Sequence, residues 1–332
     1  MKAMALARQG PVASRPLSFA DIPDPEPGPG EIRVRVAACG VCRTDLHVVE
    51  GDLAPRRMPL VPGHQVVGRV DAVGEGASRF RVGDRVGIAW LRGTCGTCDA
   101  CRRGDENLCP SSTFTGWDAD GGYAEKAVVP EAYAYSIPER FEDAAATPLL
   151  CAGIIGYRAL TRSRVPRGGR LGLYGFGSSA HIVIQIARAR GCEVYVATRD
   201  AKHRKLAEDL GARWVGGTTD VPPVALDGAI VFAPVGDVVP PALRALRPGG
   251  TVAIAGIHLT GIPALDYEKD LFQERTLTSV TANTRRDGEA LLAEAAAIGL
   301  APRVTRLPLD KANEVLRALA EDRVAGTAVL IP

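Results

Sequence analysis

The sequence of 332 residues has few aromatic side chains, little net charge and no long apolar run. Phe, Trp and Tyr make up only 5%, so the core must be packed mainly from aliphatic side chains. A formal net charge of +2 offers no basic or acidic excess for nucleic acid or a membrane surface. The segment 1–17 has Arg and Pro where a secretory signal needs an apolar core, and no apolar run is long enough to span a bilayer. We therefore expect a cytoplasmic protein with no nucleic-acid and no membrane partner.

Eight cysteines are present, and in a reducing compartment thiols serve as metal ligands or buried side chains more often than as disulfides. Four of them form the cluster Cys95-x2-Cys98-x2-Cys101-x7-Cys109. Four thiolates in one short loop can close a tetrahedral shell around Zn²⁺, which leaves no position for a substrate. The spacing predicts a structural zinc site, with disulfides or inert thiols as the alternative.

A second group of soft ligands is dispersed along the chain. Cys42, His64 in Pro62-Gly-His-Gln65, and Cys151 are far apart in sequence. If they converge, two thiolates and an imidazole leave the fourth zinc position free for water or substrate, which is the arrangement of a catalytic zinc. Taken alone, Cys151 fits a core position better than a ligand position.

The chain is too long for a single core and suits two domains. The first half has short strands broken by Gly and Pro, which indicate a compact antiparallel β unit, with strands expected at 32–36, 66–73 and 84–88. Beyond residue 170 the pattern alternates between strands and helices, as in a doubly wound parallel sheet. The expected strands are 170–174, 193–198, 229–233, 251–256 and 277–281, and the expected helices are 180–190 and 200–210. Two further helices at 289–298 and 311–320 and a strand at 327–331 follow.

A glycine-rich turn, Gly175-Phe-Gly-Ser-Ser-Ala180, follows the first strand of that alternation and opens a helix. It fits the G-x-G-x-x-A pattern, in which the backbone comes close to a pyrophosphate at a helix N-terminus. The motif residues Gly175, Gly177, Ser178 and Ala180 are therefore candidates for cofactor binding. A plain turn is the alternative.

Read together, Cys42, His64 and Cys151 resemble the ligand set of the zinc-dependent medium-chain alcohol dehydrogenases, and the resemblance extends over essentially the whole chain. The family's ligand matches Cys42 and not Cys39, so Cys39 and Cys192 are left in the core. The resemblance implies a GroES-like β-barrel domain at 1–150 with a zinc lobe at 91–112. It also implies a Rossmann domain at 151–282 and a return to the first domain at 283–332. The expected function is reversible hydride transfer between a primary or secondary alcohol and a nicotinamide cofactor, in a homodimer or homotetramer with one catalytic and one structural zinc.

Three polar residues near Cys42 are candidates for proton handling. Asp45 can accept the second ring N–H of His64 and fix its tautomer, or it can simply cap a turn. Zinc lowers the pKa of a bound alcohol, so a proton must leave the site. The resemblance implies that Thr44 and then His47 carry it, although a solvent-exposed histidine without a role is the alternative for His47.

Cofactor choice depends on the end of the second strand of the parallel sheet. Thr198 and Arg199 favour NADP, because a small hydroxyl side chain followed by Arg can receive a 2′-phosphate. Asp200 is expected to cap the next helix, but NAD becomes the prediction if its carboxylate faces the ribose. Arg43 matches the family's second phosphate contact, against a solvated surface arginine.

The sequence departs from the family at two points. It says least about which residues line the substrate pocket. Gln65 stands where many relatives have Glu, and Thr327 stands near the position of a phosphate-binding Arg. The resemblance implies that Thr44, Trp90 and Leu91 border the metal, with Trp117 or Tyr123 approaching from the next loop. Two other functions stay open: a dedicated NADPH-dependent aldehyde reductase, and a non-catalytic dinucleotide-binding protein on the same scaffold.

Overall fold

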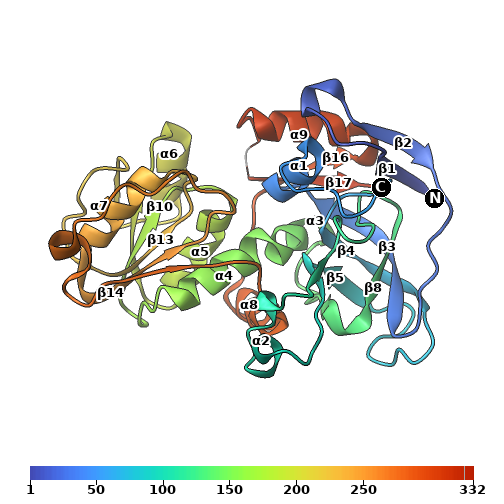
Figure 1. The fold of residues 1–332 in the computed structure, drawn as a ribbon, viewed down its shortest axis with the longest axis horizontal. Coiled ribbons are helices and arrows are strands. Elements are labelled where there is room, and N and C mark those ends of the chain that lie inside the picture. Colours follow the sequence, from blue (N-terminus) through green and yellow to red (C-terminus); the bar gives the residue numbers. More distant parts are fainter. Residues whose placement is uncertain (325) are drawn as a thin grey trace. The chain divides into compact units, whose positions relative to one another are not determined.

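The computed structural model describes residues 1–324 and 326–332, and the chain divides into two units (Figure 1). Unit 1 comprises Met1–Cys151, Ala282–Ala296 and Ala301–Pro332, and unit 2 comprises Ala152–Thr281 and Ala297–Leu300. Relative to the expected boundaries, Cys151 and residue 282 fall in unit 1, and a short segment at 297–300 falls in unit 2. Unit 2 is therefore inserted into unit 1 along the chain.

Unit 1 is built on an antiparallel sheet with the order β16-β17-β3-β4-β5-β9, in which β8 also pairs with β3. Only the β16–β17 pair is parallel. The strands of this sheet are β3 (Glu31–Gly40), β4 (Gln65–Val73), β5 (Arg85–Ile88), β8 (Lys126–Pro130), β9 (Ala134–Ser136), β16 (Val304–Pro308) and β17 (Thr327–Ile331). Two small sheets accompany it, β1 (Lys2–Leu6) with β2 (Leu17–Asp21), and β6 (Leu91–Gly93) with β7 (Thr113–Phe114).

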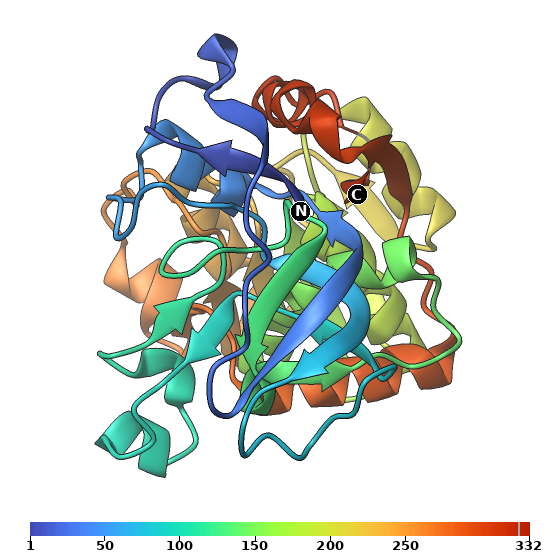
Figure 2. The same cartoon turned by 90° about the vertical axis from the view of Figure 1, so that its right-hand side faces the viewer.

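The period of two in β3 shows why this sheet forms. Ile32, Val34 and Val36 are buried on one face, while the residues between them are partly or fully exposed. β3 pairs with β4, β8 and β17, so it is the central strand, and Figure 2 shows it as a long blue ribbon across unit 1. Both termini lie on this unit in the two views. Its helices are α1 (Arg43–Glu50), α2 (Asp99–Arg102), α3 (Asp143–Ala146), α9 (Ala312–Ala320) and most of α8 (Arg285–Ile298).

Unit 2 contains a parallel sheet with the order β12-β11-β10-β13-β14-β15. This is the strand order of the dinucleotide-binding doubly wound fold, so the predicted fold class is confirmed. The strands are β10 (Arg170–Tyr174), β11 (Glu193–Ala197), β12 (Trp214–Gly216), β13 (Leu226–Val231), β14 (Leu246–Ile254) and β15 (Thr276–Ser279). The helices are α4 (Ala152–Arg162), α5 (Ser178–Ala189), α6 (Ala201–Asp209) and α7 (Val239–Arg244).

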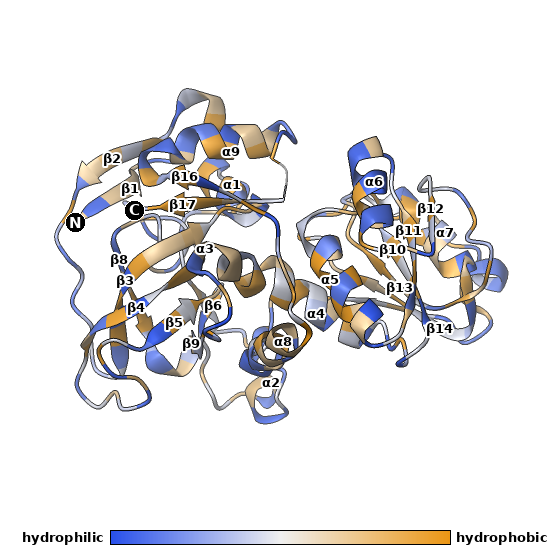
Figure 3. Ribbon diagram, turned by 180° about the vertical axis from the view of Figure 1, so that it is seen from behind, coloured by the Kyte–Doolittle hydropathy of each residue, from blue (hydrophilic) through white to orange (hydrophobic). Residues whose placement is uncertain are grey.

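Burial explains the hydropathy of unit 2. Its strands are largely apolar, whereas α6 carries only Ala207 as a buried residue and is mostly hydrophilic in Figure 3. Strands covered on both sides by helices have no polar face, which gives the continuous apolar runs expected from the sequence. α5 packs beside α4. The two helices approach closely at Gly156, where a Cβ would lie only 2.6 Å from the Val183 side chain.

The expected strands and helices are confirmed within a few residues. The helices α2, α3, α4 and α7 were not predicted, and neither was α1 after Cys42. It has eight residues and a polar composition, and it begins with a cap formed by Cys42 and Asp45. No single helix in the described part of the chain is long and apolar enough to cross a membrane, although one bent pair, Asp143–Leu150 with Ala152–Arg162, meets the length and composition criteria.

Candidate active site and metal centres

Three predicted ligands from separate elements of unit 1 converge. Cys42 precedes α1 at the end of β3, His64 precedes β4, and Cys151 follows a 3-10 turn at Thr147–Leu150. The β3–β4 register pairs Gly40 with Gln65, which brings the first two ligands side by side. Cys42 Sγ lies 3.3 Å from His64 Nε2 and 3.8 Å from Cys151 Sγ. All three ligand atoms lie within 4.8 Å of one another.

These distances fit a zinc ion. At tetrahedral angles, Zn–S bonds of about 2.3 Å place two sulfurs about 3.8 Å apart and a sulfur and an imidazole nitrogen about 3.5 Å apart. The two thiols are too far apart for a disulfide, whose sulfurs are bonded at about 2.05 Å. Two sulfurs and one imidazole supply three of four tetrahedral positions, so the donor set suits a zinc that keeps one position open.

Asp45 connects two of these ligands. Its Oδ1 accepts from His64 Nδ1 at 2.9 Å, and its Oδ2 accepts from the Cys42 backbone N–H at 2.9 Å. Asp45 therefore makes both interactions that the sequence left as alternatives, the partner of His64 and the cap of α1. The bond to Nδ1 leaves Nε2 pointing at the thiol cluster, which is the tautomer a metal ligand needs.

The electrostatics of the cluster follow from the burial of Asp45 and His64 and from the charges that lie close together there. Burial raises the pKa of Asp45, although the His64 charge opposes that shift. Burial would lower the pKa of His64, but the Asp45 and Cys42 charges outweigh it and raise that pKa well above the usual value. The hydrogen bond from Cys151 and the neighbouring His64 hold the pKa of Cys42 well below its usual range. The protein thus favours a thiolate at Cys42, the form that binds metal.

Thr44 and His47 lie three residues apart on α1, hence on one side of the helix. Thr44 is buried, while His47 is partly exposed and its Nδ1 lies 2.7 Å from Asp52 Oδ2. Asp52 lies beyond the end of the helix, where helical spacing does not apply, so no pattern in the sequence identified it as the partner of His47. Gly51, at a φ of 99°, turns the chain back so that Asp52 reaches His47.

The four-cysteine cluster also forms within unit 1. The Sγ atoms of Cys95, Cys98, Cys101 and Cys109 lie within 4.8 Å of one another, and the pair Cys95–Cys109 is 3.6 Å apart. Backbone hydrogen bonds from Thr97 and Cys98 lower the pKa of Cys95 to about 6. Four thiols at tetrahedral spacing, one of them readily ionised, suit a closed zinc shell.

An ion pair attaches this zinc lobe to α8. The Arg285 guanidinium donates to both carboxylate oxygens of Glu106, with the shortest contact 2.7 Å, and the Arg285 backbone N–H donates to Oε1. Glu106 is only 8% exposed. A bidentate pair whose carboxylate is buried holds the lobe in a defined position.

The glycine-rich turn of unit 2 has the geometry of a phosphate-binding loop. Gly175 has a φ of 89°, and a Cβ there would lie 2.7 Å from the backbone nitrogen of Ala233, so glycine is required. Gly177 begins α5 with no side-chain cap, and a Cβ at this position would meet nothing within 4 Å. Open space at an uncapped helix N-terminus fits the pyrophosphate of a dinucleotide. Ser178 is the first residue of α5, and Ala180 is fully buried.

The residues at the end of β11 take separate positions. Thr198 is buried, whereas Arg199 is exposed. Asp200 Oδ1 accepts from the backbone N–H groups of Lys202 and His203 at 2.8 and 2.9 Å, so it caps α6 as expected.

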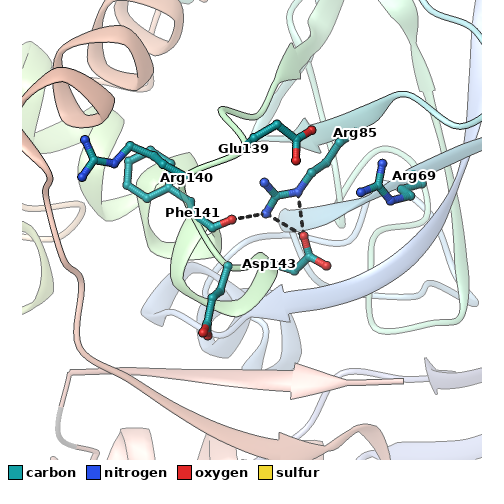
Figure 4. A pocket seen from close by; sticks show the side chains of 7 residues that line it. Arg69, Arg85, Glu139, Arg140, Phe141 and Asp143 are labelled. Atoms are coloured by element: carbon teal, nitrogen blue, oxygen red, sulfur yellow. Dashed lines mark hydrogen bonds and ion pairs between the residues drawn. The ribbon is translucent and has the colours of Figure 1, made fainter.

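A hollow on unit 1 contains none of the predicted site residues (Figure 4). The Arg85 guanidinium points between the Asp143 carboxylate and the Phe141 carbonyl, at 2.7 and 2.6 Å, and also donates to Pro138. This hollow of about 400 Å³ is therefore bordered by a guanidinium whose three nitrogens are all engaged within the unit. It is lined by Arg69, Arg85, Glu139, Arg140, Phe141, Glu142 and Asp143.

Comparison with known proteins decides the family. Residues 28–139 match the family described as "Alcohol dehydrogenase GroES-like domain", and residues 180–297 match "Zinc-binding dehydrogenase". The chain is 55% identical over 336 aligned residues to a probable alcohol dehydrogenase AdhA of Mycobacterium tuberculosis (strain CDC 1551 / Oshkosh), covering all of this chain and 97% of that protein. The chain belongs to the zinc-dependent medium-chain alcohol dehydrogenase family.

Solved structures agree with this membership. An NAD-dependent alcohol dehydrogenase superimposes with a TM-score of 0.90 at 28% identity, covering all of both chains. A cobalt- and zinc-bound thermostable alcohol dehydrogenase from Pyrobaculum aerophilum gives a TM-score of 0.89 at 25% identity, covering 100% of this chain and 99% of that one. Membership confirms the predicted GroES-like and Rossmann domains. It also confirms that the protein is an oxidoreductase.

Gln65 stands at the position where the family resemblance led us to expect Glu in many relatives. Its side chain is 1% exposed, and both amide atoms are without a hydrogen-bond partner among the described residues. It follows His64 directly and lies against Gly40, where a Cβ would come within 3.0 Å of the amide. The amide carries no charge, so the metal ligands face one negative charge fewer than a Glu would provide.

Two other positions, Arg43 and Thr327, bear on the expected contacts with the cofactor phosphates. Arg43, the expected phosphate contact, forms an ion pair with Asp322, and both side chains are exposed. Thr327 is buried, with its hydroxyl unpartnered among the residues described, so no cation extends from this position.

The residues expected to border the metal separate into core and exposed groups. Leu91 and Tyr123 are fully buried, and Tyr123 packs on Gly63, where a Cβ would lie 2.4 Å from its ring. Trp90 and Trp117 are partly exposed and stack on one another. Trp90 also meets the His64 ring edge-on at 5.1 Å, so it is the aromatic side chain in contact with a predicted ligand.

Proposed function

We propose that this chain is an NAD(P)-dependent alcohol dehydrogenase that interconverts a primary or secondary alcohol with its aldehyde or ketone. The supporting observation is the three-donor cluster of Cys42, His64 and Cys151, whose distances suit a zinc with an open position. Its relatives are named alcohol dehydrogenases, which supports the same reaction class.

The residues around the cluster have distinct roles in this proposal. When bound, zinc supplies a Lewis acid for the alcohol or carbonyl oxygen, and the nicotinamide supplies the hydride acceptor or donor. Asp45 holds His64 Nδ1–H and keeps its Nε2 aimed at the other ligands. The Thr44 hydroxyl receives the alcohol proton and passes it towards His47. Asp52 accepts His47 Nδ1–H and so leaves Nε2 of that ring to take the proton.

A second zinc, held by the four-cysteine lobe, is also part of the proposal. Its support is the mutual approach of four thiols and the lowered pKa of Cys95. Because four thiolates fill a tetrahedral shell, this ion stabilises the lobe and takes no part in the reaction.

We infer a preference for NADP over NAD. Asp200, the carboxylate that could select NAD, is engaged by two backbone N–H groups at the start of α6. Thr198 and the exposed Arg199 then offer a hydroxyl and a cation for a 2′-phosphate. The phosphates themselves bind at Gly175, Gly177, Ser178 and Ala180, with Arg43 as a cationic contact.

The cellular setting completes the proposal. A cytoplasmic location is part of the proposal, because a reducing compartment keeps thiols available as metal ligands. A homodimer or homotetramer remains the expected assembly, with 1–150 and 283–332 as catalytic domain and 151–282 as cofactor domain. The alternative function, an NADPH-dependent aldehyde reductase, would use the same site. It would differ from the proposed alcohol dehydrogenase only in the direction of flux and in a strict need for NADPH.

The test is a zinc and activity measurement on the purified protein. Elemental analysis should give two zinc ions per chain, and a panel of alcohols and aldehydes should show turnover that is faster with NADP(H) than with NAD(H) at equal concentration. Cys42→Ser should lose turnover and one zinc, whereas Cys192→Ser, outside both clusters, should keep both. No turnover by the zinc-loaded protein with any member of the panel would refute the enzyme and revive the non-catalytic dinucleotide-binding protein.

A further inference from the structure

Three aromatic rings and one guanidinium form a continuous stack in unit 1. Trp90 stacks on Phe114 with ring centroids 4.9 Å apart and on Trp117 with centroids 5.9 Å apart, at interplanar angles of 22° and 11°. The Arg56 guanidinium lies 3.9 Å from the centroid of the Trp117 ring. In a chain with only 5% aromatic residues, this concentration of flat side chains requires an explanation.

The stack ends at a predicted metal ligand. Trp90 meets the His64 imidazole edge-on, with centroids 5.1 Å apart at 75°. His64 is itself held by Asp45, so the position of Trp90 relative to the ligand cluster is defined through one fixed ring. Trp90, Phe114 and Trp117 are all partly exposed, so these rings are not merely part of the buried core.

Arg56 joins two chain segments that build this stack. It comes from the segment between α1 and β4, and its Nη1 donates to Asp118 Oδ1 at 2.9 Å in the segment after β7. Asp118 is fixed in turn, because its Oδ2 accepts from the Phe114 backbone N–H at 2.8 Å. Trp117 Nε1 donates back to the Ala54 carbonyl at 2.9 Å. Arg56 therefore spans the same two segments as the Trp117 hydrogen bond and covers the face of the ring.

The next residue provides a natural comparison. Arg57 forms an ion pair with Asp120 at 3.0 Å, which also links the two segments. The two arginines have similar side-chain exposure, 45% and 51%. The cation–ring contacts of this region belong to Arg56, which approaches Trp117 and Phe114.

We propose that Arg56 is a positioning residue that orders the Trp117–Trp90 stack beside His64, and that this stack selects flat aromatic or conjugated alcohols and aldehydes as substrates. The inference rests on the proposed function and names its substrate class. A flat unsaturated substrate gains ring–ring contact with an ordered indole, which a short aliphatic substrate cannot make. Arg56 acts by keeping Trp117, and through it Trp90, in one orientation.

The test compares two primary alcohols that differ in their π surface, benzyl alcohol and butan-1-ol. Wild-type protein loaded with zinc should have a higher kcat/KM for benzyl alcohol. Arg56→Ala should lower the benzyl-to-butyl ratio of kcat/KM by about threefold, the size of one partly exposed cation–π contact, mainly through KM for benzyl alcohol. Arg56→Lys should retain part of the preference because it keeps a cation without a planar group. Arg57→Ala should leave the ratio unchanged.

A double-mutant cycle separates positioning from general loosening. Trp117→Leu should lower the ratio as Arg56→Ala does, and the double variant should show no further fall, since Arg56 acts through that ring. Near-ultraviolet circular dichroism should report the loss of tryptophan ordering in Arg56→Ala but not in Arg57→Ala. Additive effects of Arg56→Ala and Trp117→Leu, or equal losses with both alcohols, would overturn the positioning role.

The outcome for wild-type protein distinguishes this inference from the function on which it rests. Turnover of both alcohols with a preference for butan-1-ol would overturn the substrate class and leave the dehydrogenase intact. No turnover of either alcohol, or of any in the wider panel, would instead remove the proposed function.

Discussion

Replacing Asp45 with Asn tests whether the catalytic ligand set is oriented by a buried carboxylate. The substitution keeps the size of the side chain and removes one acceptor. In the protein, each carboxylate oxygen accepts one bond, from His64 Nδ1 and from the Cys42 backbone N–H, both at 2.9 Å. An imidazole that binds metal through Nε2 carries its proton on Nδ1, so both partners of Asp45 are donors.

The expected magnitude follows from this count of donors. Asn has a single acceptor oxygen, so one of the two buried donors must lose its partner or face an N–H. A buried donor left unsatisfied costs about 1–3 kcal/mol, which corresponds to about 5-fold to 140-fold in an equilibrium constant. Removal of a partner that orients a metal-binding histidine typically weakens metal affinity by about 10-fold to 100-fold. We therefore expect zinc at Cys42, His64 and Cys151 to be held about 10-fold to 100-fold more weakly in Asp45→Asn.

The assay is chelator competition followed by elemental analysis. At a chelator concentration that leaves wild-type protein with two zinc ions, Asp45→Asn should fall towards one, because the four-cysteine lobe does not contact Asp45. Asp287→Asn is the matched control: Asp287 accepts from Thr284 N and Oγ1 beside the start of α8, and both of these donors lie outside the cluster of Cys42, His64 and Cys151. If Asp45→Asn holds both ions as firmly as wild type, the orienting role of Asp45 is wrong.

Two further predictions concern ion pairs in unit 1. Glu106→Gln should lower the free energy of unfolding by about 1–3 kcal/mol at neutral pH, because it weakens the bidentate bond between a buried carboxylate and the partly exposed Arg285. Although burial opposes it, Arg285 lowers the pKa of Glu106, so this stabilisation is present above the unfolded glutamate pKa of about 4.3 and is lost as the pH falls through the lower folded value. Urea unfolding at pH 7 and pH 3 should show the difference between wild type and variant shrinking in acid; a constant difference would contradict the ion-pair assignment. Asp322→Asn should lower KM for the cofactor by about 2-fold to 5-fold by releasing Arg43 from an exposed pair, whereas an unchanged or higher KM would argue against Arg43 as a phosphate contact.

Local patterns in the sequence account for much of this protein. The four-cysteine spacing predicts its own cluster because all four ligands lie in one short loop, and the glycine-rich turn predicts its helix because strand, turn and helix are adjacent. The alternating strands and helices after residue 170 were likewise sufficient for the parallel sheet, since connections in such sheets are short and of one hand. The helix cap formed by Asp200 was also predictable, because it needs only an aspartate directly before the helix.

Other features depend on contacts between distant segments, which no local pattern encodes. Taken alone in the sequence, Cys151 fits an ordinary core position, and only the folding of unit 1 places it 3.8 Å from Cys42. Asp52 reaches His47 through a left-handed glycine turn, and Arg43 meets Asp322 from the other end of the chain. Arg56 is one of two adjacent exposed arginines, and its contact with Trp117 distinguishes it from its neighbour. Residue type and spacing determined which chemistry this chain carries, whereas the tertiary structure decided which side chains are close enough to share a metal, a proton or a ring face, because those interactions extend over only a few ångströms.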